Sequence, residues 1–467
     1  MVEAAPNPNC PGCQALLKRV EQLMERISQL EAKVERLEAR LRQNSSNSNR
    51  PPSSDPPWSK PSGGASASDR KQGGQPGHEK SMRKLLPPDR LDEFHDVKPT
   101  ECSHCGTALW GEDRHPVRHQ VTELPPVEPV VREYRLHALK CRACGQTTRA
   151  ELPKGVPRGS FGPRLHAMVA LFSGAYRLSR RNVKRLLADT FGVEISLGAI
   201  SKLEGSIAQA LAAPHRDALG RVRRARVAHA DETSWRERRT KSWLWTAVTR
   251  KATVYLVRAS RGACVARELL GKRSRGHLVS DRCPSYGWVE TRRRQVCWSH
   301  LIRDFRKIAL SGKEAEPIGE CLEAAAQELF GHWYRVRDGT MKRATFQRYA
   351  IELRRRIRRL LELGGACNAW RAPSLCRGIL ELEPAMWNFV KHEGIEPTNN
   401  VAERMIRPGV LWRKTSLGSQ SERGSRFVER LLTCVANLRQ QERNVLEYLT
   451  SVTTATLRGA PIPALLN

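Results

Sequence analysis

Three acidic residues, far apart in the chain, have the settings expected of a divalent-metal site. Asp231 follows the apolar run 226–230, Asp281 follows the short run 276–280, and Glu403 lies near the start of a predicted helix. A carboxylate at the end of a buried strand costs free energy unless it is paired or binds a metal. Three carboxylates can hold two magnesium ions, which activate the attacking oxygen and stabilise the leaving oxygen of a phosphodiester.

Each acid also has an ordinary structural interpretation. An acidic residue after a strand is often a helix cap or a turn residue. Glu403 has Arg407 four residues later, a spacing typical of an ion pair on a helix surface. Glu232, next to Asp231, is expected to be a supporting or solvent-facing residue. The metal-site hypothesis therefore depends on elements that bring the three acids together.

The segments around Asp231 predict a mixed sheet. Two runs rich in β-branched and aromatic residues follow it, separated by Arg250-Lys251 as in a hairpin, so the three strands form a meander. Three strands followed by alternating helix and strand is the ribonuclease H-like order, in which the first and fourth strands are neighbours. We therefore expect Asp231 and Asp281 at one end of the sheet. The predicted elements after Asp231 are strands at 242–249 and 252–257, a helix at 264–270, strands at 276–281 and 295–297, and a helix from His300.

Cysteine pairs predict a second, structural metal site. Of 13 cysteines, six form C-x-x-C pairs, and two of these pairs are followed by glycine, at Cys102-Ser-His-Cys105-Gly and Cys141-Arg-Ala-Cys144-Gly. Two such knuckles around a strand-rich segment at 127–139 predict a zinc ribbon, because each pair wraps two thiolates around the metal. Reduced, unligated thiols are the alternative. Cys10 and Cys13 supply only half of the ligands of a zinc site. They either share a zinc ion with the same pair of a second chain or are unligated surface thiols.

The N-terminal segment 14–43 carries a heptad repeat. One seam position is mostly β-branched and the other is leucine, a pattern typical of a parallel two-stranded coiled coil. Arg26 and Lys33 would face Glu31 and Glu38 of the partner helix, so we expect a homodimer. A single amphipathic helix packed on its own domain is the alternative. The seam residues are Val20, Ile27, Val34 and Leu41 at one position and Leu16, Leu23, Leu30 and Leu37 at the other.

A helical pair is predicted before the sheet. The first helix covers 177–191 and ends at Gly192, and the second begins with Ser196 as its N-cap. The pair resembles a helix-turn-helix, with basic residues on its first helix, although a plain helical hairpin fits the pattern equally well.

The overall charge indicates a polyanionic partner. Lys and Arg total 80 against 48 Asp and Glu, which gives a formal net charge of +32. DNA is the first candidate. The sequence contains no uninterrupted apolar stretch of about 18 residues and no signal peptide, so we expect a cytoplasmic protein, nucleoid-associated in a bacterium, without a membrane partner.

Several of these motifs, taken in order, resemble those of the insertion-sequence-66-type transposases. They are the coiled coil, a Gly-Gln-Pro-Gly-His linker, the two knuckles, Asp231-Glu-Thr, Cys297-Trp-Ser-His300-Leu-Ile-Arg-Asp-Phe, and Asn399-Asn-Val-Ala-Glu403-Arg. The resemblance implies a multidomain α/β protein with a ribonuclease H-like core and the DDE triad Asp231, Asp281 and Glu403, Asp231 being the bridging ligand. It also implies a helical insertion before the third acid. Residues 313–395 fit this insertion, with one apolar stripe at Phe346, Ala350, Leu353, Ile357 and Leu360. Residues expected to contact DNA are His300, Arg404, Arg407, Arg413 and Lys414. His300 would orient a phosphate or the nucleophile; the alternative is a structural histidine with its hydrogen bonds satisfied at a helix start.

The implied activity is metal-dependent cleavage and strand transfer at the ends of an insertion sequence. It requires two magnesium or manganese ions and structural zinc, with terminal inverted repeats, target DNA and small accessory transposition proteins as partners. Two motifs depart from the family pattern, since 282–286 reads Arg-Cys-Pro-Ser-Tyr where Gly-Tyr is usual, and 413–415 reads Arg-Lys-Thr for Arg-Lys-Asn. A catalytically decayed, zinc-containing DNA-binding regulator is therefore the alternative.

These patterns divide the chain into eight segments. In order they are a cysteine pair with the coiled coil (1–43), a flexible Ser/Pro/Gly-rich linker (44–95), the zinc ribbon (96–155), the helix-turn-helix-like segment (156–222), the first part of the core (223–312), the helical insertion (313–395), the second part of the core (396–450) and a tail (451–467).

Overall fold

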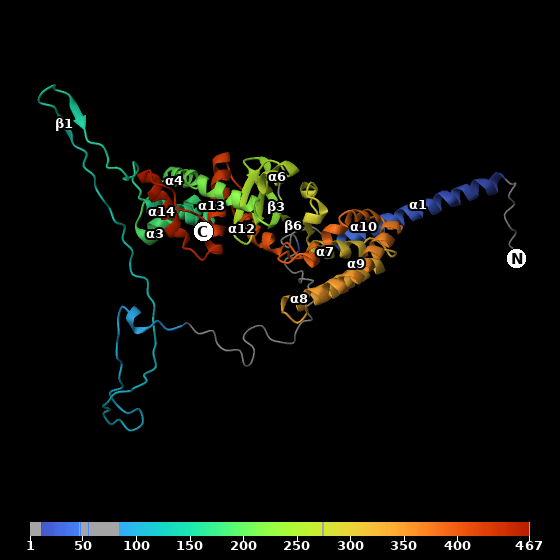
Figure 1. Cartoon of the computed structure of the whole chain (residues 1–467), viewed down its shortest axis with the longest axis horizontal. Helices are drawn as coiled ribbons and strands as arrows, with labels where there is room; N and C mark the ends of the chain where they lie inside the picture. The colour runs from blue at the N-terminus through green and yellow to red at the C-terminus, as the bar shows by residue number, and fades with distance from the viewer. Residues whose placement is uncertain (1–10, 46, 48–54, 56–83, 273–274, 467) are drawn as a thin grey trace. The chain divides into compact units, whose positions relative to one another are not determined.

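The computed structural model describes residues 11–45, 47, 55, 84–272 and 275–466 (Figure 1). The chain divides into two compact units, one formed by 62–129 and the other by 1–61 with 130–467, and each is described by itself. Cys10 and most of the predicted linker lie outside the described residues. None of the helices described is long and apolar enough to cross a bilayer.

Helix α1 runs without interruption from Pro11 to Leu41. Its heptad pattern predicted a helix here, and the seam residues remain exposed in the single chain. The least exposed of them, Val20, is still 45% exposed and Leu41 is 85% exposed. A continuous exposed leucine and valine stripe is what a coiled-coil partner would cover.

Both cysteine knuckles have the turn that their glycines predicted. The amide of Gly106 donates to the Cys102 carbonyl, that of Gly145 donates to the Cys141 carbonyl, and both hydrogen bonds are 2.9 Å long. The two glycines have φ values of +74° and +72°, a left-handed conformation that suits glycine. The first knuckle belongs to the smaller unit, which also contains the 3-10 helix η2 (Pro88–Arg90).

The second knuckle joins two short antiparallel strands, β1 (Ala138–Lys140) and β2 (Thr147–Arg149). The longer strand predicted at 127–139 is therefore wrong for most of its length. Its earlier residues lack a ladder partner among the residues described, and an isolated strand leaves its backbone groups unpaired.

The predicted helical pair is present with its predicted caps. Ser196 is the N-cap of α4 and accepts a hydrogen bond from the Ala199 amide, and Gly192 ends α3 at a φ of +61°. Helix α3 begins later than expected, because Ser179 caps it and Arg177 has a positive φ of 60°. The elements of this region are α2 (Pro163–Ala170), the π-helix η3 (Leu171–Ala175), α3 (Arg180–Phe191), α4 (Leu197–Ala210) and α5 (Ala212–Arg223).

A five-stranded mixed sheet follows, in the order β5-β4-β3-β6-β7. The first three strands form the predicted antiparallel meander. Strand β6 pairs in parallel with β3, and β7 pairs in parallel with β6. The prediction that the first and fourth strands are neighbours is confirmed. The strands are β3 (Val227–Glu237), β4 (Thr240–Val248), β5 (Thr253–Arg258), β6 (His277–Ser280) and β7 (Arg294–Val296), with α6 (Ala263–Leu270), η4 (Pro284–Tyr286) and η5 (Thr291–Arg293) between them.

Helix α13 (Glu422–Gln440) covers the open edge of this sheet. The outward amides of Thr253, Tyr255 and Val257 on β5 donate to side chains of α13, at 2.9, 3.0 and 3.0 Å. The acceptors, in that order, are Asn437, Thr433 and Glu429, spaced four residues apart and thus on one face of the helix. The edge strand is therefore blocked by side-chain acceptors rather than by another strand.

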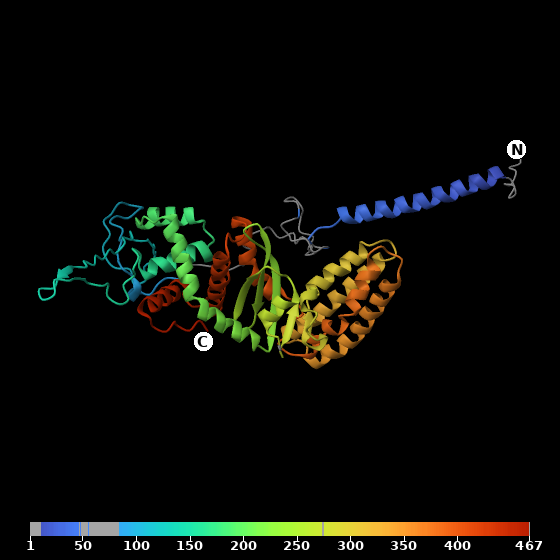
Figure 2. The same ribbon diagram turned by 90° about the horizontal axis from the view of Figure 1, so that it is seen from above.

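Helices between β7 and the third acid form a bundle with its own core (orange in Figure 2). On α9 the predicted apolar stripe is buried at Phe346, Ala350, Leu353 and Ile357, but its next buried residue is Leu361 instead of Leu360. The bundle contains α7 (Trp298–Ala309), α8 (Glu316–Arg337), α9 (Arg343–Ala366), α10 (Ala372–Leu380), η6 (Glu383–Met386) and α11 (Asn388–Lys391). Helices α12 (Asn400–Ser416), α13 and α14 (Val445–Arg458) complete the chain.

Candidate active site

Asp231 lies on β3, and Asp281 directly follows β6, the parallel strand next to β3. The register pairs His229 with Val279, so two residues further along it sets Asp231 opposite Asp281, directly after the end of β6. Strand β3 continues to Glu237, because β4 pairs with it that far, so Asp231 lies inside the strand. The expectation that it ends the strand is wrong, and it is β6 that stops there.

Strand geometry separates Asp231 from Glu232. Asp231 pairs with Thr246 and Glu232 with Trp245, and successive strand residues point to opposite faces. The Glu232 carboxylate accepts a 2.7 Å hydrogen bond from the Tyr286 hydroxyl and pairs with Arg261 at 2.9 Å. Its side chain is only 1% exposed, so Glu232 is a buried, partnered acid and the solvent-facing interpretation is wrong.

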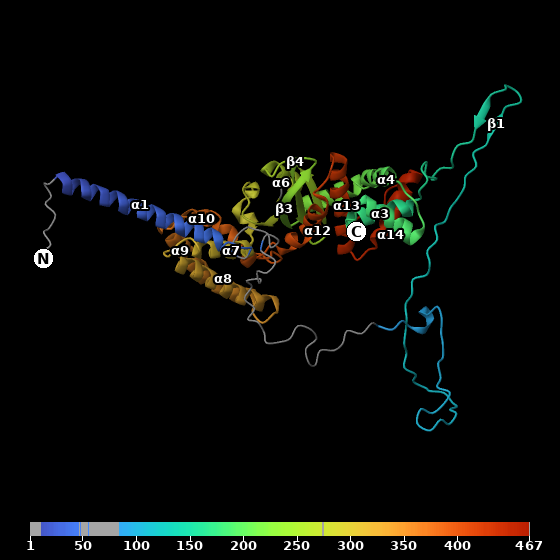
Figure 3. The ribbon, with the colours of Figure 1, turned by 180° about the vertical axis from the view of Figure 1, so that it is seen from behind.

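Glu403 comes to this site from the first turn of α12, which lies beside β3 (Figure 3). Burial raises the pKa of Asp231 well above its usual value, and the charges of Glu232, Asp281 and Glu403 raise it further. Asp231 is therefore close enough to both of the other predicted acids for their charges to act on it. The described hydrogen bonds to the carboxylates of Asp231 and Asp281 come from backbone amides, those of Glu232 and Cys283, both at 2.9 Å.

Asn399 connects the elements that carry these acids. Its side-chain amide donates to the Ala230 carbonyl at 2.8 Å, and its backbone amide donates to the Cys297 Sγ at 3.1 Å. Residues 398–400 read Thr-Asn-Asn, a run typical of a helix cap. Asn399 is the N-cap residue of α12 but makes no side-chain cap hydrogen bond, and its Oδ1 has no hydrogen-bond partner among the described residues.

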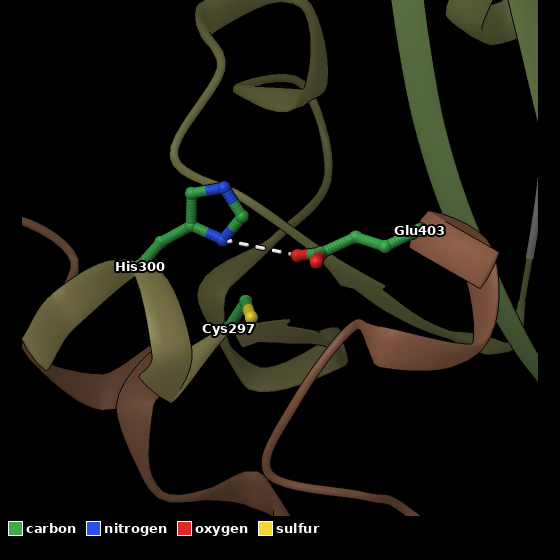
Figure 4. A group of neighbouring side chains, drawn as sticks. All are labelled: Cys297, His300 and Glu403. Atoms are coloured by element: carbon green, nitrogen blue, oxygen red, sulfur yellow. Dashed lines mark ion pairs between the residues drawn. The ribbon is translucent and has the colours of Figure 1, made fainter. Parts of the chain in front are cut away.

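His300 faces Glu403 from the first turn of α7. Its Nδ1 lies 3.6 Å from Glu403 Oε1, and an Arg303 guanidinium nitrogen lies 3.9 Å from the same oxygen (Figure 4). Burial and the Arg303 charge lower the pKa of His300, which keeps its imidazole neutral near pH 7. Helix α7 begins at Trp298, two residues before the predicted start, with Cys297 as its N-cap residue.

The basic residues expected to contact DNA fall into two groups. Arg404, Arg407 and Lys414 are exposed on α12. Arg413 is half-buried, and its guanidinium donates to the Ser234 carbonyl at 2.8 Å and the Thr233 hydroxyl at 3.3 Å. Arg413 therefore holds α12 against β3, whereas the other three are free to face solvent.

Three residues of the site had no role assigned from the sequence. Tyr286 lies in the 282–286 segment that departs from the family pattern, and this departure is the sequence signal that could have drawn attention to it. Asn399 was expected only as a cap, and Arg261 has no pattern around it that would single it out. In the same departing segment, Arg282 pairs with the buried Asp304 at 2.6 Å, which fixes the loop that follows Asp281.

Residues 158–427, more than half of the chain, match the model of the Transposase IS66 family. The chain belongs to this family. Its matched range contains Asp231, Asp281 and Glu403. Residues 99–145 match the zinc-finger binding domain of transposase IS66, a range that contains all four knuckle cysteines.

Two further matches of this IS66-family chain are to sequences described as of unknown function or uncharacterized. Residues 5–84 match a family of unknown function (DUF6444). The uncharacterized protein y4qI of Sinorhizobium fredii (strain NBRC 101917 / NGR234) is 25% identical over 404 residues, which cover 80% of this chain and 74% of that protein.

Proposed function

We propose that this IS66-family transposase cleaves and joins DNA at the ends of an insertion sequence, with Asp231, Asp281 and Glu403 binding two magnesium or manganese ions. The observation that carries the proposal is the strand register that sets Asp231 opposite Asp281, with Glu403 on α12, which packs against β3. Burial and then the charges of Glu232, Asp281 and Glu403 raise the pKa of Asp231, and the described hydrogen bonds to the carboxylates of Asp231 and Asp281 come from backbone amides. Clustered acids of this kind are typical of functional sites.

The residues fit the proposed ions. Glu403 Oε1 is a buried atom with no hydrogen-bond partner among the described residues, and the charge of Glu403 raises the pKa of Asp231. Magnesium takes oxygen ligands and keeps several waters, so three carboxylates suffice without a closed cage. Bound there, the ions would activate an attacking hydroxyl and stabilise the leaving oxygen.

The protein's own groups have separate tasks in this proposal. Asp231, on the central strand β3, would be the ligand shared by both ions, and Asp281 and Glu403 would each hold one of them. Exposed Arg404, Arg407 and Lys414 bind the phosphates of the DNA ends. A carboxylate oxygen of Glu232 lies within 4.8 Å of one of Asp281. Both Glu232 oxygens already accept hydrogen bonds from Tyr286 and Arg261, so we assign Glu232 no metal in this proposal.

The remaining modules support the same function. We infer that the sheet with α7 and α12 is a ribonuclease H-like core and that Cys102, Cys105, Cys141 and Cys144 bind one structural zinc. The α3–α4 pair, which presents basic residues, would read the terminal inverted repeats, and α1 would form a homodimer that holds two ends together. Small accessory proteins and target DNA complete the proposed assembly, which acts at the bacterial nucleoid.

The test is cleavage and joining of duplex DNA that carries the terminal repeats flanking the gene, with full-length protein and magnesium. Asp231→Asn, Asp281→Asn and Glu403→Gln should each reduce both products to background, because each removes a metal ligand. Asp338→Asn, the same chemical change at an exposed acid next to the end of α8, serves as the control. Magnesium-dependent products that persist in Asp231→Asn would refute the proposal. DNA binding with no nicking by the wild type would favour a decayed regulator instead.

A further inference from the structure

Three potential ligands of a softer cation meet where α7 and α12 begin. The thiol of Cys297, a ring nitrogen of His300 and a carboxylate oxygen of Glu403 all lie within 4.8 Å of one another. Figure 4 shows the three side chains directed toward one point from two different helix starts. Cys297 and His300 are three residues apart at the start of α7, a spacing that brings both to one side.

Two buried atoms of this cluster lack a hydrogen bond among the described residues. His300 Nδ1 and Glu403 Oε1 are both buried and neither has a hydrogen bond among the described residues, although only 3.6 Å separates them. Arg303, the nearest cation, is 3.9 Å from the carboxylate oxygen, beyond hydrogen-bond distance. Buried polar atoms are rarely left unsatisfied, and such cases mark strain, a functional role or a missing ion.

The donor set favours a different ion from the three acids. Thiolate and imidazole are ligands of zinc and its neighbours in the transition series, whereas magnesium takes oxygen. Three protein ligands with one open position are the arrangement of zinc sites that keep water or substrate bound. The backbone amide of Asn399 donates to Cys297 Sγ at 3.1 Å, an outer contact that orients a metal-bound thiolate.

We propose that Cys297, His300 and Glu403 form a binding site for a zinc-class divalent cation. Binding replaces the thiol proton, which leaves to solvent, with a sulfur–metal bond, and no electrons change hands. The neutral imidazole of His300 offers its lone pair without losing a proton.

This site shares Glu403 with the magnesium site, and that consequence rests on the proposed function. A zinc-class ion held by Cys297 and His300 would draw Glu403 away from Asp231 and Asp281. The binding itself needs neither DNA nor magnesium, so it can be tested apart from transposition.

The experiment measures zinc per chain in full-length protein after equilibration with zinc and removal of the unbound metal. A Cys102→Ser/Cys105→Ser background weakens the ribbon site and so isolates the second one. In that background Cys297→Ser and His300→Ala should each lose close to one zinc per chain. Cys434→Ser should keep the parent content, because Cys434 is buried in α13 and belongs to neither ligand cluster.

Cobalt supplies the second readout. A thiolate-to-cobalt absorption band should appear in the background protein and vanish in Cys297→Ser, while His300→Ala should alter its intensity. His300 is partly exposed, so its alanine variant stays informative if the buried Cys297 change prevents folding. Equal zinc content in the background protein and in His300→Ala, with an unchanged cobalt spectrum, would overturn the proposal. The loss of catalysis in Asp231→Asn would be unaffected by that result.

Discussion

The side-chain amide of Asn399 donates a 2.8 Å hydrogen bond to the carbonyl of Ala230, the residue directly before Asp231. One buried side chain thereby connects the strand that carries the first acid to the helix that carries the third. The same residue binds α7 through Cys297, so three elements converge on it. Glu403 lies four residues after Asn399, so this contact positions Glu403 relative to Asp231.

Asn399→Ala should therefore impair catalysis more than its distance from the reacting atoms suggests. Loss of the buried amide leaves the Ala230 carbonyl without this donor, which costs about 1–3 kcal/mol in the free energy of unfolding. We expect cleavage to fall while DNA binding by exposed basic residues is kept. Urea unfolding and an end-cleavage assay measure the two effects, with Asn368→Ala, an exposed loop residue, as control. Wild-type cleavage in a variant of confirmed lower stability would exclude the positioning role.

Asp231 should make the magnesium-free protein less stable as the pH rises. Its folded-state pKa is raised, so the folded state binds the proton more tightly than the unfolded state does. Stability from this group is fully present below the unfolded pKa and is lost as the pH rises through the folded value. Asp231→Asn should remove this loss and so make the magnesium-free protein more stable than the wild type near pH 7. Thermal unfolding from about pH 4 to 8 measures the difference, and an unstable Asp231→Asn protein would contradict it.

Tyr286 should be needed for stability through Glu232. Its hydroxyl donates to a buried carboxylate, and hydrogen bonds to charged groups are worth about 1.5–3 kcal/mol. Tyr286→Phe should therefore lower the free energy of unfolding by about that amount. Tyr334→Phe, which removes a hydroxyl from an exposed tyrosine, should be neutral. If Glu232→Gln restored the stability lost in Tyr286→Phe, the buried charge would be identified as the cause.

Helix α1 should hold two chains together. Placing glutamates at Leu23 and Leu30 puts charges into the exposed seam, so light scattering of the full chain should report a monomer instead of a dimer. Gln22→Glu with Gln29→Glu adds the same charge to the helix next to each leucine, outside the seam, and should leave a dimer. A dimer that survived the leucine changes would place the interface elsewhere in the chain.

The amino-acid sequence alone predicted much of the local structure. Runs rich in β-branched and aromatic residues predicted β4 and β5. Ser196, Gly192 and the knuckle glycines predicted where segments start and turn. These signals are local, because a cap or a turn depends on residues within one helical turn. The strand predicted at 127–139 was wrong for most of its length because a local residue pattern does not show whether a second strand is available to pair with it.

The side-chain roles at the site were decided by tertiary structure. Asp231 and Glu232 are adjacent in sequence, and only the pairing with β4 shows that they point to opposite faces. The partners of Glu232 are 29 and 54 residues away, and Asn399 reaches Ala230 across 169 residues. Hydrogen bonds and ion pairs act over a few ångströms, so the contacts made by these side chains exist only once the distant strands and helices have packed together.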